Sequence, residues 1–223
     1  MSWKTGPGVV SWKTAPGDEA PQGRRTDGRG RAVSDRAEPL VRLPTQPLIE
    51  AGTALRPWRD DDLDALVQAC QDPEISRWTS VPQPYGEADA RIYLRQRRES
   101  VDAGTSAAFA IVAAADDALL GSVALSRFAP EHQRAEVGYW LASSARGQGH
   151  ATRAVRLICH WGFQKLRLER IELMAATGNL ASQRVAERCG FTREAVLRSH
   201  LHGRGGYNDM VMFGLLPGDD AAR

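Results

Sequence analysis

The chain has 223 residues, of which 42% are hydrophobic and 25% are charged, and its formal net charge at neutral pH is +2. This length and apolar content predict one globular domain with a full core and exclude two domains of ordinary size. The nearly balanced charge gives no electrostatic argument for binding nucleic acid or a membrane surface.

The cysteines and the N-terminal stretch bear on the cellular compartment. Cys70, Cys159 and Cys189 form neither a CxxC pair nor a metal-ligand spacing, and such a sparse, odd set favours a reducing compartment without disulfides. No apolar run approaches the roughly 18 residues that a membrane span needs. The stretch Met1–Gly17 lacks the continuous apolar segment of a signal peptide. We therefore expect a cytoplasmic protein.

Residues 1–50 differ in composition from the rest of the chain. They are rich in Gly, Pro, Arg, Asp and Ser and show almost no apolar periodicity, which predicts a disordered N-terminal extension. A short repeat starts at Ser2 and again at Ser11, each time reading Ser-Trp-Lys-Thr. Two interpretations stay open: a plain extension, or a short peptide that docks a partner through Trp3 and Trp12.

Beyond this extension, seven strands and four helices are predicted. The strands are Thr53–Trp58, Phe109–Ala113, Leu119–Ser126, Glu136–Leu141, Arg170–Ala176, Glu194–Arg198 and Asn208–Leu215. The helices run from the acidic cap Asp60–Asp62 to Cys70, from near Gly86, from Gly149 to Leu166 and from Asn179 to Cys189. The order β-α-α-β-β-β-α-β-α-β-β predicts one α/β domain over residues 53–217.

The strongest functional signal lies between Ala135 and Thr152. The predicted strand Glu136–Leu141 runs into a turn that contains Gly147 and Gly149, and this turn opens a long amphipathic helix. N–H groups at a helix start lack internal partners, the helix dipole is positive there, and glycine lets the backbone approach a ligand closely. The pattern predicts an anion site suited to a pyrophosphate.

Two common nucleotide motifs fit this turn poorly. A Walker A loop requires Gly-Lys-Ser/Thr, which the turn does not contain. A dinucleotide fingerprint would place Thr152 where a small residue is needed, although Glu169 and Glu172 lie about 20 residues further on, as that motif requires. A dinucleotide-binding fold would also need a doubly wound sheet, and the chain has too few residues left after this turn to form one.

A third motif fits at every specified position. Arg146–Ala151 matches Q/R-x-x-G-x-G/A, the coenzyme A motif of the GNAT (GCN5-related N-acetyltransferase) superfamily. Three further stretches resemble its RimJ/RimL-like subgroup, the ribosomal-protein N-terminal acetyltransferases. They are AEVGYWL before the turn, GNLASQRVAERCGF at Gly178–Phe191 with its N-x-x-S helix, and GGYNDMVMFGLL at Gly205–Leu216. The resemblance covers nearly the whole chain after the extension.

The resemblance implies the GNAT fold: an α/β (α+β) architecture with a mixed, mostly antiparallel sheet, splayed central strands and helices on both faces. The pantetheine arm of acetyl-CoA would lie between Glu136–Leu141 and Arg170–Ala176. By this resemblance the residues that bind acetyl-CoA are Tyr139, Trp140, Leu141, Arg146, Gly147, Gln148, Gly149, His150, Ala151, Thr152 and Asn179. No metal is expected.

The resemblance also implies the chemistry, which is direct attack of a primary amine on acetyl-CoA in a ternary complex. Ser182 stands at the serine of N-x-x-S and is the candidate acid toward the sulfur, and Asn179 would fix the pantetheine arm or a water. Glu136 is the candidate base, directly or through water. Structural alternatives stay open: Asn179 and Ser182 as helix caps, and Glu136 as a cross-strand partner of an arginine such as Arg170.

The favoured acceptor is the α-amine of a protein or peptide N-terminus. A small amine such as an antibiotic, a polyamine or an amino acid is the alternative within the same chemistry. A non-catalytic CoA-binding module and a nicotinamide- or flavin-binding domain are the alternatives outside it. The sequence is compatible with a monomer and with a homodimer.

Overall fold

The computed structural model of the chain describes residues 41–220, apart from the side chain of Asp220. Eight strands within this range form one sheet. They are β1 (Leu48–Glu50), β2 (Thr53–Pro57), β3 (Ala107–Ala113), β4 (Leu119–Ala129), β5 (Arg134–Leu141), β6 (Arg170–Ala176), β7 (Thr192–Gly203) and β8 (Gly206–Leu215). Their order in the sheet is β1-β2-β3-β4-β5-β6-β8-β7, and all neighbours are antiparallel except the parallel pair β5 and β6. The expected mixed, mostly antiparallel sheet is confirmed.

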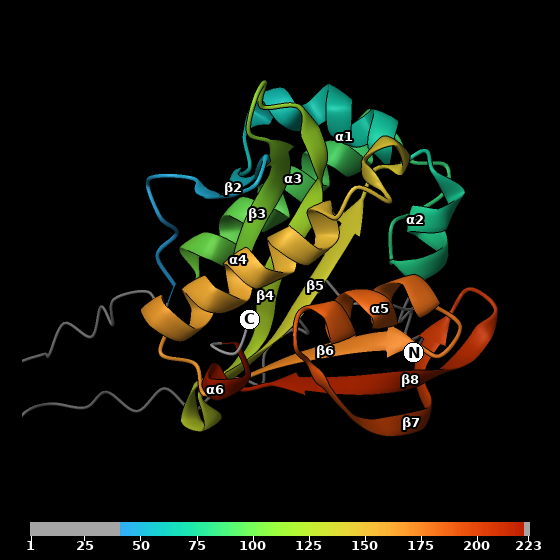
Figure 1. Cartoon of the computed structure of the whole chain (residues 1–223). Helices are drawn as coiled ribbons and strands as arrows, with labels where there is room; N and C mark the ends of the chain where they lie inside the picture. The colour runs from blue at the N-terminus through green and yellow to red at the C-terminus, as the bar shows by residue number, and fades with distance from the viewer. Residues whose placement is uncertain (1–40, 221–223) are drawn as a thin grey trace, which may run out of the picture.

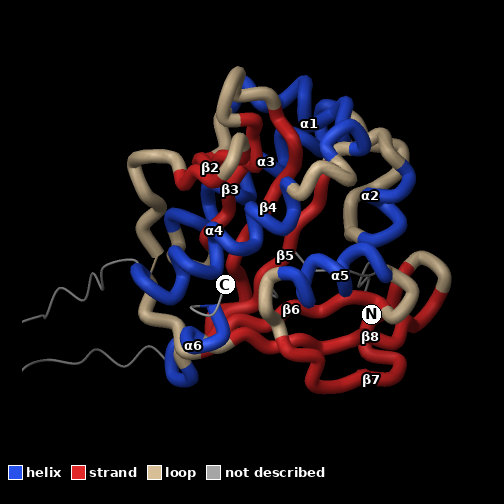
Figure 2. Tube along the Cα trace, viewed as in Figure 1, coloured by secondary structure: helices blue, strands red, loops and turns tan. Residues whose placement is uncertain are grey.

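Helices cover both faces of this sheet. They are α1 (Leu63–Ala69), α2 (Pro73–Trp78), α3 (Glu87–Asp102), α4 (His150–Lys165), α5 (Leu180–Arg188) and α6 (Pro217–Asp220), with 3₁₀ turns η1 (Asp60–Asp62), η2 (Pro130–His132) and η3 (Ser143–Ala145). In Figure 2, α4 crosses in front of the strands and α3 lies behind them. Within residues 41–220, no helix combines the length and the apolar character that a membrane crossing requires.

The alternation of side chains along the strands divides the core between the two faces. Phe109 and Ile111 of β3 pack with Ile158 of α4 in the largest cluster of buried residues. Ala110 lies on the opposite face of the same strand. On β5, Trp140 likewise packs with the residues of α1 and α3. The central strands are therefore buried on both sides, and the site described below lies where they separate.

The parallel pair β5 and β6 is in contact over only part of its length. Its register contains three pairs, of which Glu136↔Glu172 is the last. From Val137 onward β5 pairs only with β4, and β6 continues beside β8 as far as Ala176. Figure 1 shows β5 running up toward α2 while β6 runs across beneath α5. The expected splay of the central strands is thus confirmed, and it leaves a free backbone edge on each strand.

The structure also contains elements that the sequence patterns did not predict. β1 pairs with β2, and Val41 is buried in the main core cluster, so ordered structure begins before the boundary expected at residue 53. Helix α2 is new as well, and β7 extends from Thr192 to Gly203, beyond the predicted Glu194–Arg198. Residues 1–40 of the predicted extension, including Trp3 and Trp12, lie outside the described residues.

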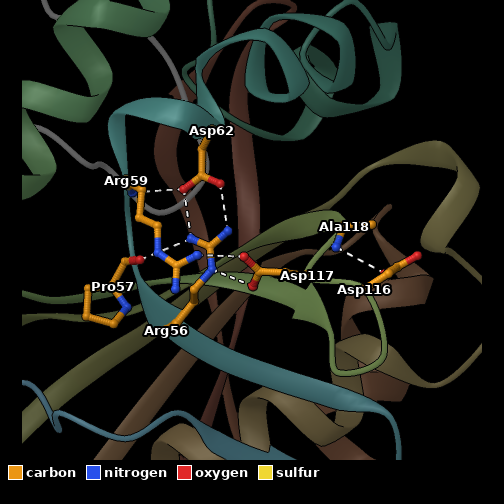
Figure 3. Close-up of polar contacts among 7 residues, drawn as sticks. All are labelled: Arg56, Pro57, Arg59, Asp62, Asp116, Asp117 and Ala118. Atoms are coloured by element: carbon orange, nitrogen blue, oxygen red, sulfur yellow. Dashed lines mark hydrogen bonds and ion pairs between the residues drawn. The ribbon is translucent and has the colours of Figure 1, made fainter.

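A buried arginine ties the first long strand to α1 and to the β3–β4 turn. The Arg56 guanidinium donates two hydrogen bonds, of 2.9 and 2.8 Å, to the carboxylate of Asp62, and its Nε donates to Asp117 Oδ1 at 2.7 Å (Figure 3). Arg59 also contacts Asp117 at 2.6 Å. Arg56 is only 4% exposed, so these carboxylates provide the charge partners that a buried guanidinium needs.

Candidate active site

A cleft of about 270 Å³ lies where β5 and β6 separate. Its walls come from the open ends of the two strands, from one side of α2, from the start of α5 and from the turn before α4. The lining residues are Glu74, Ile75, Trp78 and Thr79 of α2 and its end; Val137, Gly138, Tyr139, Trp140 and Leu141 of β5; Arg146, Gly147 and Ala151; Leu173 and Met174 of β6; and Asn179, Ala181, Ser182 and Val185. Elements distant in sequence thus meet around the splay.

The start of α4 opens toward this cleft. Gly149 is the N-cap, with a φ of +81° and no side-chain cap, and Gly147 has a φ of +75° with open space where a Cβ would point. The first turn of α4 carries no acidic residue. Free helical N–H groups and a positive dipole end without a competing carboxylate are the features of an anion site.

Side chains from α4 brace this turn from behind. Arg153 donates from Nη2 to the carbonyl of Gln148 at 2.8 Å and from Nε to Thr53 Oγ1 at 2.7 Å. His150 Nδ1 lies 2.9 Å from the same Thr53 hydroxyl, and burial together with the charge of Arg153 lowers its pKa. Of the predicted pyrophosphate turn, Arg146, Gly147 and Ala151 line the cleft, whereas Gln148, Gly149, His150 and Thr152 do not.

Arg146 connects the turn to α2. Its guanidinium lies 2.7 Å from Asp72 Oδ2, as an ion pair without hydrogen-bond alignment, and it donates to the carbonyl of Leu141 at 2.9 Å. Asp72 is the N-cap of α2 and accepts from the N–H of Glu74 at 2.9 Å. The end of β5, the turn and α2 are therefore held together at the mouth of the cleft.

Three predicted site residues meet across the gap between β5 and α5. Tyr139 Oη donates to Ser182 Oγ at 3.1 Å, and Asn179 Oδ1 accepts from the backbone N–H of Ser182 at 3.1 Å. Asn179 is thus the N-cap of α5, which is the structural alternative to a role in binding the pantetheine arm. It also lines the cleft. Burial raises the pKa of Tyr139, so its hydroxyl keeps its proton at neutral pH.

Glu136 lies one step below the cleft, at the last paired rung of β5 and β6. It is 3% exposed, and its Oε2 lies 3.3 Å from Nη1 of Arg127, while Oε1 has no hydrogen-bond partner among residues 41–220. Burial raises its pKa; the charge of Arg127 opposes this and the charge of Glu172 adds to it. Two residues further along the same face is Gly138, which lines the cleft and has no side chain to separate the carboxylate from it.

A second cavity, here called the outer trough, adjoins the cleft. It has a volume of about 460 Å³ and lies between α2 and the β7–β8 hairpin. Glu74, Trp78 and Thr79 line both cavities, so the two spaces share one wall. The remaining lining residues are Pro73, Ser76, Arg77, Gln83, Ala176, Leu201, Gly203, Arg204, Gly205, Asn208 and Met210. The two cavities therefore lie next to each other along α2.

The sequence patterns missed α2 and Arg127, which both border the site. Asp72 followed by Pro73 is an N-cap followed by a proline at the first helical position, and this signal could have located α2. Arg127 stands in a bulge of β4, where the register shifts between Ser126 and Ala129, and it has a φ of +52°. Nothing in the local sequence predicts this bulge.

Residues 53–192 of the chain match the family described as Acetyltransferase (GNAT) domain. The protein belongs to the GNAT acetyltransferases. The family uses acetyl-CoA, and the cleft fits this cosubstrate because a free strand edge, an uncapped helix start and Gly147 with its positive φ converge there. Among the described residues, no group of three or more His, Cys, Asp or Glu side chains is arranged to hold a metal ion.

Relatives of this GNAT protein include enzymes with two kinds of acceptor. The Ribosomal-protein-serine acetyltransferase of Escherichia coli (strain K12) is 32% identical over 98 residues, which are 44% of this chain and 55% of that protein. The structure of RimL, a ribosomal L7/L12 α-N-protein acetyltransferase, in complex with coenzyme A, has a TM-score of 0.70 and 21% identity over 77% of this chain and 98% of its own. The structure of spermidine N-acetyltransferase from Vibrio cholerae, in complex with CoA and spermine, has a TM-score of 0.65 and 22% identity. The match covers 76% of this chain and 98% of that chain.

These two structural likenesses identify the fold and leave the acceptor open, because a protein acetyltransferase and a polyamine acetyltransferase share it. The protein is an acetyl-CoA-dependent N-acetyltransferase of the GNAT family. What it acetylates has to be argued from the residues around the cleft.

Proposed function

We propose that the protein acetylates the α-amine of a peptide or protein N-terminus, by direct attack of the amine on acetyl-CoA. The observation that carries this proposal is the outer trough. A small acceptor needs space only beside the acetyl group, whereas a peptide needs a continuous path from the reacting amine to the surface. The outer trough adjoins the cleft along Glu74, Trp78 and Thr79, and this adjacency supports such a path. The similarity to a ribosomal-protein-serine acetyltransferase supports the same acceptor.

The roles proposed for the chain's own residues follow from their positions. The free edge of β5 at Tyr139, Trp140 and Leu141 would bind the pantetheine arm, and one of its N–H groups would stabilise the negative charge that develops on the thioester oxygen. Gly147 and the start of α4 would bind the pyrophosphate.

Two proton transfers accompany the attack. Glu136 would accept the proton of the amine through water, because its carboxylate lies below the side-chain-free position of Gly138. Ser182 would give a proton to the departing sulfur and recover it from water, while the hydrogen bond that Tyr139 donates to it stabilises the charge on its oxygen. Asn179 would hold Ser182 in place through the cap of α5. Since an α-amine has a pKa near ~8, a modest base is sufficient.

The experiment is an acceptor panel with acetyl-CoA. The acceptors are peptides with a free N-terminus, the same peptides with a blocked N-terminus and an internal lysine, and spermidine. CoA release and the mass and position of the product are measured. We expect acetylation of the free α-amine only. Acetylation of spermidine or of the lysine side chain, without α-amine acetylation, would refute the proposal.

A further inference from the structure

The outer trough has an order of charge that matches an amine followed by a carboxylate. Glu74 lines both the cleft and the trough and is therefore the inner charged residue of the path. Arg77 and Arg204 line the trough but not the cleft, so they lie further than Glu74 from the reacting end of the path. Among the described residues these three are the ionisable side chains of its lining; Glu74 and Arg77 form an ion pair at 3.2 Å, so the net positive charge of the trough comes from Arg204 at its outer side.

The inner carboxylate is oriented by its own helix. Glu74 accepts from Nε1 of Trp78 at 3.1 Å and from Nη1 of Arg77 at 3.2 Å. The Arg77 guanidinium also lies over the Trp78 ring, 4.7 Å from its centre. One face of α2 therefore offers a carboxylate beside an aromatic ring, next to the cleft, with the arginine at its outer side. Arg77 balances the charge of Glu74, and the carboxylate keeps lone pairs that can accept hydrogen bonds from an entering ammonium group.

The outer charge comes from the tip of the β7–β8 hairpin. Glycines flank Arg204 on both sides, at Gly203 and Gly205, so the tip presents a single long side chain. Nη2 of Arg204 donates to the carbonyl of Val81 at 2.6 Å, which holds the hairpin against the segment after α2. Within the described chain no carboxylate is paired with this guanidinium, and a carbonyl leaves most of its five donors and its full charge available.

We propose that Arg204, together with Arg77, selects acceptors that carry a carboxylate within the first few residues behind the reacting α-amine. This inference rests on the proposed function, since it concerns the same acceptor path. An acidic side chain in an extended N-terminal peptide would meet the two guanidinium groups, and arginine binds carboxylates with well-aligned hydrogen bonds. A second ammonium group at the same place, as in a polyamine, would meet like charges and be disfavoured.

The test compares two peptides that differ only in charge, with Glu or Gln at positions 2 to 4 behind the same N-terminal residue. For the wild type we expect the KM of the Glu peptide to be about three- to tenfold lower, in the range of partly exposed charge pairs, with similar kcat. The difference should shrink as salt is added, because exposed charges are screened. Equal KM values at low salt would overturn the inference.

Variants separate the charge of Arg204 from its contact with Val81. Arg204→Gln keeps an N–H donor for the carbonyl and removes the charge, so we expect it to lose the preference for Glu while it still acetylates the Gln peptide. Arg204→Glu should favour a peptide with Lys at the same positions. Arg193→Ala removes an exposed arginine of β7 outside the trough and is the matched control, with an unchanged preference. A preference retained in Arg204→Gln would also overturn the inference.

The proposed function and this inference fail in different ways. If no peptide α-amine is acetylated, both the proposed function and the selection by charge fail. If both peptides are acetylated equally well at the α-amine, the proposed function stands and the selection by charge fails.

Discussion

Glu136 of β5 and Glu172 of β6 face each other in the last paired rung of the parallel ladder, so two carboxylates meet where the strands separate. Their surroundings differ. Glu172 is held by Arg134 at 3.3 Å and by Arg170 at 2.9 Å. Glu136 is buried; among the described residues its ion-pair partner is Arg127, and its Oε1 has no hydrogen-bond partner. This difference makes Glu136 the carboxylate that is suited to move a proton.

Glu136→Gln is expected to lower kcat by about 10²-fold, the usual contribution of a positioned base. A base acts as the carboxylate, so wild-type activity should rise with pH through the pKa of Glu136, which burial raises. The variant should lose this acidic limb and keep only the titration of the amine near pH ~8. The measurement is the pH dependence of kcat. Glu172→Gln is the control and should keep the limb; an unchanged profile in Glu136→Gln would remove Glu136 from the mechanism.

The stability of Glu136→Gln is expected to change in the opposite direction to its kcat. A carboxyl whose pKa is raised on folding contributes stability at low pH, and this contribution is lost as the pH rises through the raised pKa. Glutamine stays neutral throughout. We therefore expect Glu136→Gln to be at least as stable as the wild type at neutral pH, with the difference shrinking toward acid. Thermal unfolding across pH measures this, and a variant that is markedly less stable at neutral pH would contradict it.

Ser182→Ala tests the acid toward the sulfur. Because Ser182 receives a hydrogen bond from Tyr139 and lies on the wall of the cleft, its loss should lower kcat by about 10²-fold. The Kd of acetyl-CoA, measured by calorimetry, should stay nearly the same. Tyr139→Phe keeps the ring and removes the donor, so we expect a smaller loss in kcat. An unaltered kcat in Ser182→Ala would leave Ser182 with a structural role only.

The sequence predicted the elements that have periodic apolar faces and the turn that has two glycines. It also predicted that β5 and β6 separate, through the family resemblance. It did not predict α2, whose six residues are too few for a helical period, although the pair Asp72-Pro73 marks its start. The ion pair of Arg127 with Glu136 depends on a bulge in β4, and bulges are set by the packing of neighbouring strands. Contacts of that kind are not visible in a single sequence.

Gly147→Ala tests the anion site at the start of α4. Gly147 has a φ of +75° with open space around it, so alanine brings backbone strain of roughly 1–2 kcal/mol and no clash. The turn should then shift toward other conformations, and the Kd of acetyl-CoA should rise about fivefold or more. Gly52→Ala is the matched control, because Gly52 has a φ of +82° and equally open space in the β1–β2 turn. It should lower Tm to a similar extent without changing Kd.

The Arg56 network tests how the first strand is held to α1. Asp62→Ala should destabilise the protein by roughly 3–5 kcal/mol, because it removes the carboxylate that accepts two hydrogen bonds from a buried guanidinium. Arg59→Ala removes another ion pair of the same network, but Arg59 is 56% exposed, so the expected loss is below about 1 kcal/mol. Denaturant unfolding at neutral pH measures both, and equal losses would show that burial does not decide the contribution.

The pH dependence of this network follows from Asp117. The hydrogen bond from Arg56 lowers the pKa of Asp117, and the nearby charge of Arg59 acts in the same direction. A lowered pKa contributes stability above the ordinary carboxyl pKa, and this is lost as the pH falls through the lowered value. Asp117→Asn should therefore destabilise the protein at neutral pH and lose this effect in strong acid. Asp116→Asn is the control, because this neighbouring carboxylate accepts from the Ala118 N–H rather than from an arginine; a parallel pH profile for the two variants would contradict the assignment.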